Sequence, residues 1–143
     1  MDAATTPELA LVRRFWALYQ KRQWLQAQTL LSPSAQCRWW ATRERFEGAA
    51  AIVYVNAVYP EGWEIKLLEI NLLGDGRVHS LIRVDHAEAT FYANSFFRLH
   101  EQLIVALDEY WSDVQLAPAW RNGAALPGLQ AMATDSRAGL ALL

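Results

Sequence analysis

The sequence has few residues that bind metals or form cross-links. Its 143 residues include one cysteine, Cys37, and three histidines. A lone cysteine forms neither an intrachain disulfide nor a zinc cluster, and the histidines lack metal-ligand spacings such as HxH or HExxH. We therefore expect no metal site, a reducing compartment, and a core position for Cys37 beside the aromatic pair that follows it.

Long apolar runs, an excess of basic residues and glycine-rich phosphate loops are also absent. The most apolar stretches, such as AAAIVYV, are too short to cross a bilayer. A formal net charge of -2 argues against electrostatic binding of nucleic acid. The opening MDAATTPELALVRRFW lacks the features of an export signal. We expect a cytoplasmic protein with no cofactor, no membrane contact and no nucleic-acid partner.

What the chain does contain is a globular composition rich in large rings. Hydrophobic residues make up 53% and charged residues 20%, with seven Trp, five Tyr and five Phe. This balance indicates one folded domain with a substantial core. Rings of this size either fill a core or line a pocket or an interface, and their spacing does not choose between these uses.

Start and stop signals predict helices in the first sixty residues. Thr6-Pro7-Glu8 combines a capping hydroxyl, a proline at the first helical position and an acid in the first turn. Apolar residues follow at helical spacing. The pattern predicts a first helix from Thr6, a second over 23–31 that ends at Ser32-Pro33, a short strand over 37–46, and a third helix from Gly48 to Pro60.

The second half of the chain reads as strands joined by tight turns. GDG (74–76) and Glu101-Gln102 are turn signals between long apolar runs. Such short connections predict an antiparallel meander, and neither strand face is consistently polar. The strands are expected at 63–73, 77–86, 89–99 and 103–111.

Helices followed by a meander predict an α+β domain, with a curved antiparallel sheet packed on about three N-terminal helices. A strongly twisted sheet of this kind forms a cone with an internal pocket. We expect the domain to span 1–121 and an Ala/Gly-rich tail to span 122–143, either loosely ordered or laid across the surface. The helices would cover one face of the sheet and a second subunit the other.

This order of elements resembles the nuclear-transport-factor-2-like (NTF2-like) superfamily, in particular its SnoaL-like group. The resemblance lies in RFWALYQKRQWLQAQTLLSP, in RERFEGAAAIVYVNAVYPEGW, in FFRLHEQLIVALDEYWSD and in the PAWR ending. It implies the cone fold, a deep pocket for a small apolar or polycyclic molecule, and a homodimer through the sheet. It does not imply one activity, because the superfamily includes isomerases, cyclases, hydratases, epoxide hydrolases and proteins without catalysis.

Arg83, Asp85 and Glu109 are the candidate catalytic residues. Arg83 and Asp85 lie two apart on one predicted strand and therefore share a face. The spacing is similar to the limonene-epoxide-hydrolase pattern of the superfamily, which implies an acid–base pair held by an arginine; Glu109 stands where that pattern has Asp. The alternative is a structural ion pair at a strand end or on a dimer rim.

A second set of polar and aromatic residues is expected to bind the ligand. If Glu101-Gln102 forms a two-residue loop, Asn94 pairs with Glu109 and Tyr92 with Trp111, and all four share one face. A register error of one residue would move all of them to the other face. Asn56, within an apolar helical stripe, either bridges backbone groups or lines the pocket. The expected ligand-binding residues are Trp40, Asn56, Tyr92, Asn94 and Trp111.

Overall fold

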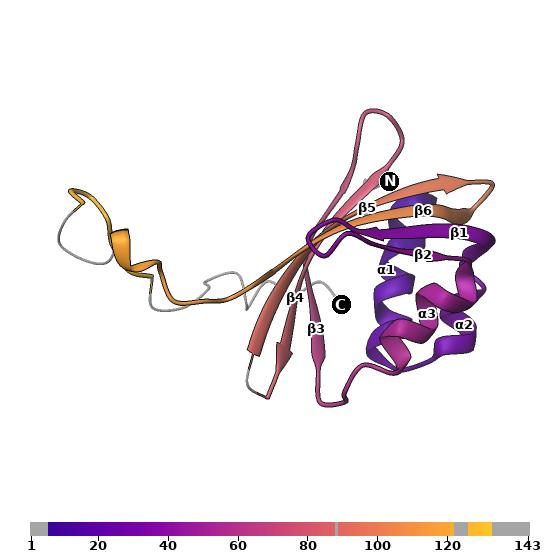
Figure 1. Ribbon diagram of the computed structural model, residues 1–143. Helices are drawn as coiled ribbons and strands as arrows, with labels where there is room; N and C mark the ends of the chain where they lie inside the picture. Colours follow the sequence, from indigo (N-terminus) through magenta and orange to yellow (C-terminus); the bar gives the residue numbers. More distant parts are fainter. Residues whose placement is uncertain (1–5, 88, 122–125, 133–143) are drawn as a thin grey trace.

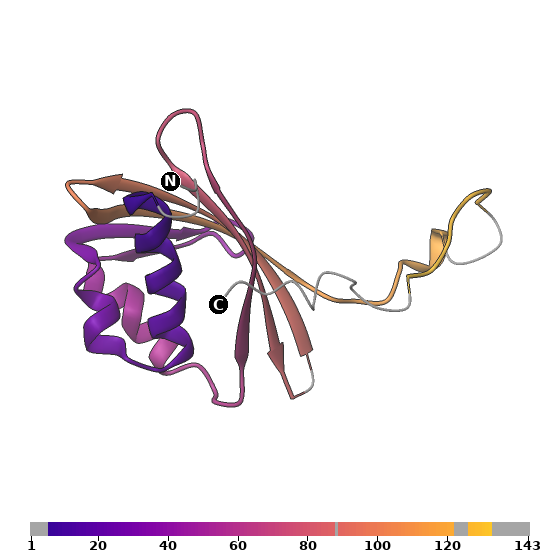
Figure 2. The same cartoon turned by 180° about the vertical axis from the view of Figure 1, so that it is seen from behind.

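The computed structural model describes residues 6–87, 89–121 and 126–132. In this part of the chain, three helices lie on one side of a six-stranded, strongly curved and unclosed sheet (Figures 1 and 2). The predicted α+β class with a curved sheet is confirmed. The elements are α1 (Pro7–Gln20), α2 (Trp24–Gln28), β1 (Leu31–Trp39), β2 (Glu44–Glu47), α3 (Ala49–Ala57), β3 (Glu64–Leu72), β4 (Val78–His86), β5 (Ala89–His100), β6 (Leu103–Asp113) and a 3-10 turn (Ala119–Arg121).

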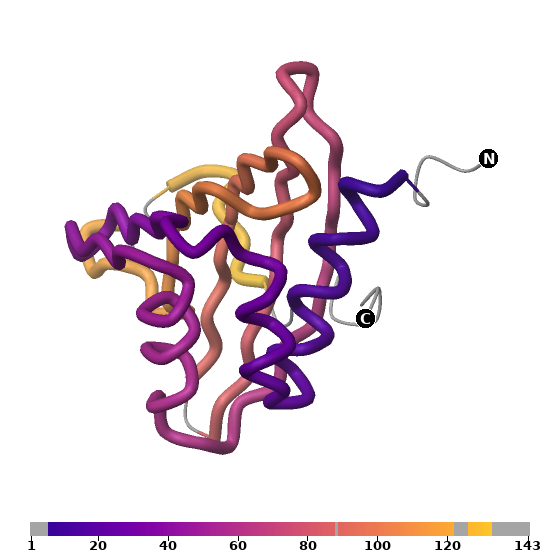
Figure 3. Tube along the Cα trace, turned by 90° about the vertical axis from the view of Figure 1, so that its right-hand side faces the viewer, coloured from indigo at the N-terminus to yellow at the C-terminus, as the bar shows by residue number. Residues whose placement is uncertain are grey.

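The strand order in the sheet is β2-β1-β6-β5-β4-β3. The run from β3 to β6 is the predicted antiparallel meander. The turn between β3 and β4 extends past the first turn of α1 (Figure 3). A parallel pair between β1 and β6 was not predicted. It joins segments about seventy residues apart, for which the local sequence pattern gives no signal.

The region between α1 and α3 differs from the prediction. The helix expected over 23–31 ends at Gln28, and Pro33 lies inside β1 instead of ending a helix. The pairing of β1 with β6 is interrupted between Leu31 and Gln36, so the missing N–H of Pro33 leaves no gap in the ladder. The single strand expected over 37–46 is a hairpin, with Arg43 at φ 58° in its turn.

The start of α3 depends on a glycine. Gly48 has φ +93°, a conformation that side chains with a Cβ rarely adopt. A Cβ built there would also lie 3.3 Å from the carbonyl oxygen of Pro33. The predicted helix start at this residue is confirmed, and the helix ends at Ala57, three residues before Pro60.

A bulge sets the register of the last hairpin. Glu101 and Gln102 form the predicted two-residue turn, both with positive φ, and His100 pairs with Leu103. The register then shifts, because Leu99 pairs with Ile104 but Arg98 pairs with Ala106. A bulge of this kind places one extra residue on one strand, here β6. Each later residue of that strand then points to the sheet face opposite to the one expected from a regular ladder.

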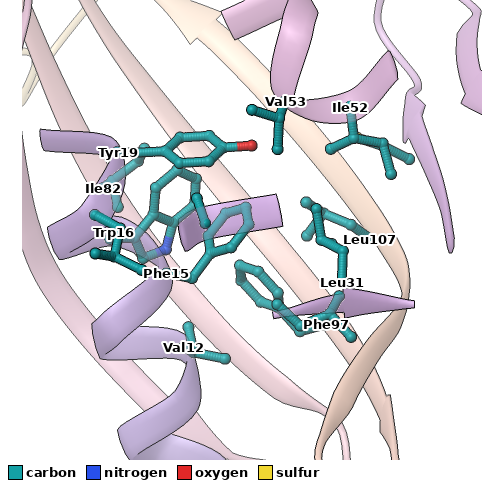
Figure 4. Close-up of a cluster of buried hydrophobic side chains, with 14 of the residues drawn as sticks. Val12, Phe15, Trp16, Tyr19, Leu31, Ile52, Val53, Ile82, Phe97 and Leu107 are labelled. Carbon is teal, nitrogen blue, oxygen red and sulfur yellow. The ribbon is translucent and has the colours of Figure 1, made fainter. Parts of the chain in front are cut away.

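The core lies between α1 and the concave face of the sheet (Figure 4). Phe97 on β5 is fully buried and makes edge-to-face contacts with Phe15 and Trp16 of α1, at centroid distances of 5.5 and 6.0 Å. The indole N–H of Trp16 donates a hydrogen bond of 3.0 Å to Oγ of the buried Ser80 on β4. This bond ties α1 to β4.

Beyond β6 the chain leaves the sheet as an extended segment, on the left of Figure 1. Leu116 and Trp120 are 95% and 73% exposed there. Of the tail expected over 122–143, only 126–132 lies within the described residues, so the boundary at 121 stays a prediction. A second subunit on the convex face also stays a prediction.

Replacing Phe97 by Ala tests which face of β5 is buried. We expect Phe97→Ala to lower the free energy of unfolding by about 3–5 kcal/mol, because it removes a ring from the packed core. The matched control is Phe96→Ala, since Phe96 is half-buried on the convex face. Urea unfolding of both variants measures the difference. An equal loss in both would contradict the assigned faces.

Candidate functional site

A cavity of about 310 Å³ lies between the helices and the concave face of the sheet. Its size falls at the lower end of the range for small-molecule sites. Sixteen residues from eight elements and their connections line it: Trp16, Tyr19, Trp39, Ala41, Thr42, Glu44, Val55, Asn56, Tyr59, Trp63, Ile65, Ile82, Val84, Phe91, Trp111 and Asp113.

The lining follows from the strand alternation. Ile82 and Val84 lie two apart on β4, and Trp111 and Asp113 lie two apart on β6, so each pair presents the same face. Helix α1 brings Tyr19 to the cavity from the opposite side. The walls are therefore built mainly from helices and strands.

The structure brings two of the expected ligand-binding residues to this cavity, Asn56 and Trp111. Trp40, Tyr92 and Asn94 do not line it. Trp40 lies in the β1–β2 turn, is 48% exposed, and donates from its indole N–H to Asp108 at 2.9 Å. The neighbouring Trp39 lines the cavity instead.

Tyr92 and Asn94 lie on the convex face with Arg83, and the bulge on β6 places Glu109 and Trp111 on the opposite, concave face. The expected pairs Asn94–Glu109 and Tyr92–Trp111 are wrong by one residue. Glu109 pairs with Ser95, and Trp111 pairs with Ala93. Asn94 accepts a hydrogen bond of 2.8 Å from the His79 ring in one tautomer of that ring, on the outer side of the sheet.

Glu109 is a buried acid directly behind the cavity wall. It is 4% exposed and does not itself line the cavity. Its carboxylate accepts hydrogen bonds from Ser95 Oγ at 2.6 Å and Trp39 Nε1 at 3.0 Å, and a longer one from Cys37 Sγ at 3.6 Å. Two neighbours, Trp39 and Trp111, also belong to the wall, so the acid and the cavity share side chains.

Burial raises the pKa of Glu109 above its ordinary value. The hydrogen bonds from Ser95, Trp39 and Cys37 act in the opposite direction but do not cancel this effect. The Trp111 indole N–H also lowers the pKa, although its geometry falls short of a hydrogen bond. No lysine or arginine among the described residues forms a salt bridge with Glu109.

Cys37 is buried, as expected for a core residue, and burial raises the pKa of its thiol. A thiol that resists ionisation is a poor nucleophile. Its contribution to the site is the S–H group that it directs at Glu109.

Arg83 and Asp85 lie on the convex face, away from both the cavity and Glu109. Arg83 Nε donates to Asp85 Oδ1 at 2.9 Å, Thr90 donates to the same oxygen at 3.1 Å, and Lys66 Nζ lies 3.4 Å from the other oxygen. Partial burial raises the pKa of Asp85, but the bonds from Arg83 and Thr90 outweigh it and the pKa is lowered. This geometry matches the structural ion pair, and the structure does not bring Asp85 and Glu109 together.

Asn56 fits both of its interpretations. Its Nδ2 donates to the carbonyl oxygen of Ile52 at 2.8 Å and lies 3.5 Å from the hydroxyl of Tyr19, while the residue lines the cavity. Burial, with the nearby charge of Glu109, raises the pKa of Tyr19. The cavity therefore has a neutral amide and a neutral phenol on its helical side.

Sequence reasoning missed several lining residues, among them Trp39, Trp63, Glu44 and Asp113. The β1–β2 hairpin was the missing signal, because it turns Glu44 back beside Trp39. Trp63 was placed at the start of a strand, but the approach of α1 to that strand was not readable from the sequence.

No group of three or more His, Cys, Asp or Glu side chains among the described residues is arranged to hold a metal ion. None of the helices described has both the length and the apolar character needed to cross a membrane.

The chain has the fold of the NTF2-like proteins. A ketosteroid isomerase-like protein from Kribbella flavida DSM 17836 superposes with a TM-score of 0.74 at 20% identity, over 90% of this chain and 93% of that one. An NTF2-like protein of unknown function from Burkholderia xenovorans LB400 gives 0.68 at 17% identity, over 88% and 95%. A SnoaL-like polyketide cyclase from Shewanella putrefaciens CN-32 gives 0.63 at 7% identity, over 75% and 90%.

These likenesses define the fold and not an activity, because all three identities are low. No family model matches the sequence. No curated protein matches it either. The chemistry must therefore be argued from the cavity and its surroundings.

The raised pKa of Glu109 makes its contribution to stability depend on pH. A carboxyl with a raised folded-state pKa stabilises the fold most below its unfolded pKa, and this contribution is lost as pH rises through the folded pKa. We expect the stability advantage of wild type over Glu109→Gln to shrink between pH 5 and pH 8, by at most about 1.4 kcal/mol per pH unit.

Asp85→Asn is the contrasting variant. The pKa of Asp85 is lowered, so the advantage of wild type over Asp85→Asn is present above the unfolded pKa and is lost as pH falls through the folded pKa. Urea unfolding of the three proteins between pH 3 and pH 8 measures both trends. A constant difference between wild type and Glu109→Gln over this range would show that Glu109 titrates normally.

Proposed function

We propose that the chain is a small-molecule-binding protein whose cavity takes a compact, largely apolar ligand. The observation that carries the proposal is the cavity of about 310 Å³, closed off by helices on one side and by the concave sheet on the other. A compact molecule that enters this space gains packing contacts with the side chains around it.

The chemistry of the walls supports an apolar body for the ligand. Rings and branched aliphatic side chains such as Phe91, Ile82 and Val84 form most of the lining. Burial of apolar ligand surface against them supplies binding free energy of roughly 25 cal/mol per Å². A few polar groups, including the amide of Asn56, would fix the orientation of the ligand.

Acid–base catalysis is the second candidate function, and Glu109 is the residue that would carry it. The pKa of Glu109 is raised toward neutral pH, which is the direction that a general acid requires. The partnership expected with Asp85 and Arg83 lacks geometric support, because those residues lie on the opposite face. Glu109 would act alone, and only if Trp39 or Trp111 moved aside.

The two candidates differ in one measurement. If a bound compound is converted, Glu109→Gln should abolish its turnover while the circular dichroism spectrum and melting temperature show an intact fold. Full turnover by this variant would exclude Glu109 as the acid or base. Saturable binding without any conversion of the compound would support the binding function and not catalysis.

A cavity-filling variant tests the binding function directly. Val55 lines the cavity from α3, so the indole of Val55→Trp would occupy the space of a ligand. We expect this variant to bind tert-butylbenzene, a compact apolar probe, at least about tenfold more weakly than wild type. Quenching of intrinsic tryptophan fluorescence during titration measures the affinity.

The matched control is Ala50→Trp, because Ala50 is exposed on the same helix and does not line the cavity. It adds the same ring and should bind like wild type. Native mass spectrometry of the freshly purified protein gives an independent test through a retained small molecule. The proposed function would be overturned if the purified protein retained no small molecule and if no small probe bound to it saturably.

A further inference from the structure

The cavity has a one-sided charge. Of the sixteen residues that line it, two are charged, Glu44 and Asp113; both are acidic and both are exposed to solvent. No lysine or arginine occurs among these described lining residues. A carboxylate beside an apolar cavity favours a guest that carries positive charge and disfavours an anion.

Strand register fixes both carboxylates on the concave face. Glu44 pairs directly with Trp39, whose ring forms part of the wall, so the two side chains share a face. Asp113 follows Trp111 by two residues on β6 and pairs with Phe91, another wall residue. The placement therefore follows from backbone pairing among four strands and does not rest on one side-chain rotamer.

Two arginines beside wall residues are engaged elsewhere. The guanidinium of Arg22 stacks on the Trp63 ring at 3.4 Å, pairs with Glu61 at 3.0 Å, and does not line the cavity. Arg38, beside Trp39, pairs with Asp108 on the convex face. Neither arginine presents its charge to the cavity, so the two acids are not neutralised from within it.

The aromatic walls, like the two acidic residues, favour a cationic ligand. Seven of the sixteen lining residues are aromatic, and they come from both helical and strand walls. The faces of aromatic rings attract cations, and boxes of such rings are used to bind quaternary ammonium groups. Rings also contact the alkyl substituents of such a cation, so one wall serves both parts of the molecule.

We propose that the ligand of this cavity is an organic cation, a quaternary or tertiary ammonium with compact apolar substituents, held by the aromatic walls and by Glu44 and Asp113. The proposal rests on the proposed binding function and adds the charge of the ligand to it. The desolvation cost of bringing an ammonium group into the cavity is offset by two carboxylates and by the ring faces.

Three probes of equal shape separate charge from size. Phenyltrimethylammonium and tert-butylbenzene differ in the replacement of N⁺ by carbon, and 2-methyl-2-phenylpropanoate supplies an anion of similar size. Each is titrated into the full chain by tryptophan fluorescence at about 0.15 M salt, where screening limits the influence of distant charges. We expect phenyltrimethylammonium to bind at least about tenfold more tightly than tert-butylbenzene and the anion most weakly.

Variants assign the preference to its residues. Glu44→Gln and Asp113→Asn should each weaken binding of the cation by about three- to tenfold and leave tert-butylbenzene within about twofold of wild type. Glu47→Gln is the control, because Glu47 lies on the same strand as Glu44, is exposed like Glu44, pairs with Arg45, and does not line the cavity. It removes the same charge and should leave all three affinities unchanged.

The outcomes distinguish this proposal from the one on which it rests. Equal or tighter binding of the neutral probe or of the anion would overturn the cationic ligand and leave the binding function standing. A cation preference that survives both variants would overturn the role of Glu44 and Asp113. Failure of all three probes to bind would count against the binding function itself.

Discussion

The bulge in the last hairpin determines which side chains reach the interior. Val105 is the extra residue, because Leu99 pairs with Ile104 and Arg98 with Ala106. With a regular ladder, the polar Asn94 would lie across from Glu109; with the bulge, Ser95 does, and its hydroxyl donates to the carboxyl at 2.6 Å. One inserted residue on β6 thus gives the buried acid its shortest hydrogen bond and turns Glu109 and Trp111 to the face opposite Tyr92 and Asn94.

The concave and convex faces then carry different electrostatics. The convex face has compensated pairs, such as Arg38 with Asp108 and Arg83 with Asp85. The concave face has carboxyls without a basic partner among the described residues, buried at Glu109 and at the cavity wall in Glu44 and Asp113.

Local sequence signals predict most of the fold. Thr6-Pro7, Gly48 and the GDG turn begin or join elements where they were expected, because capping and turn chemistry act over a few residues. The register beyond Glu101-Gln102 was not predictable, since a bulge leaves no mark in an apolar strand. The predicted position of Asn56 and Trp111 at the cavity is correct. The positions of Trp39 and Glu44 there depend on the β1–β2 hairpin and on a parallel pairing between distant segments, which local patterns do not reveal.

Trp39 belongs to two environments, since its ring faces the cavity and its N–H holds Glu109 at 3.0 Å. Ligand binding and protonation of Glu109 are therefore thermodynamically linked, because any movement of the indole changes both the cavity wall and the hydrogen bond to the carboxyl. A guest that turned the ring away would deprive the carboxyl of a donor, and a proton would be taken up from solution as the guest entered. The heat of association would then vary with the ionisation enthalpy of the buffer, even for a guest with no titratable group.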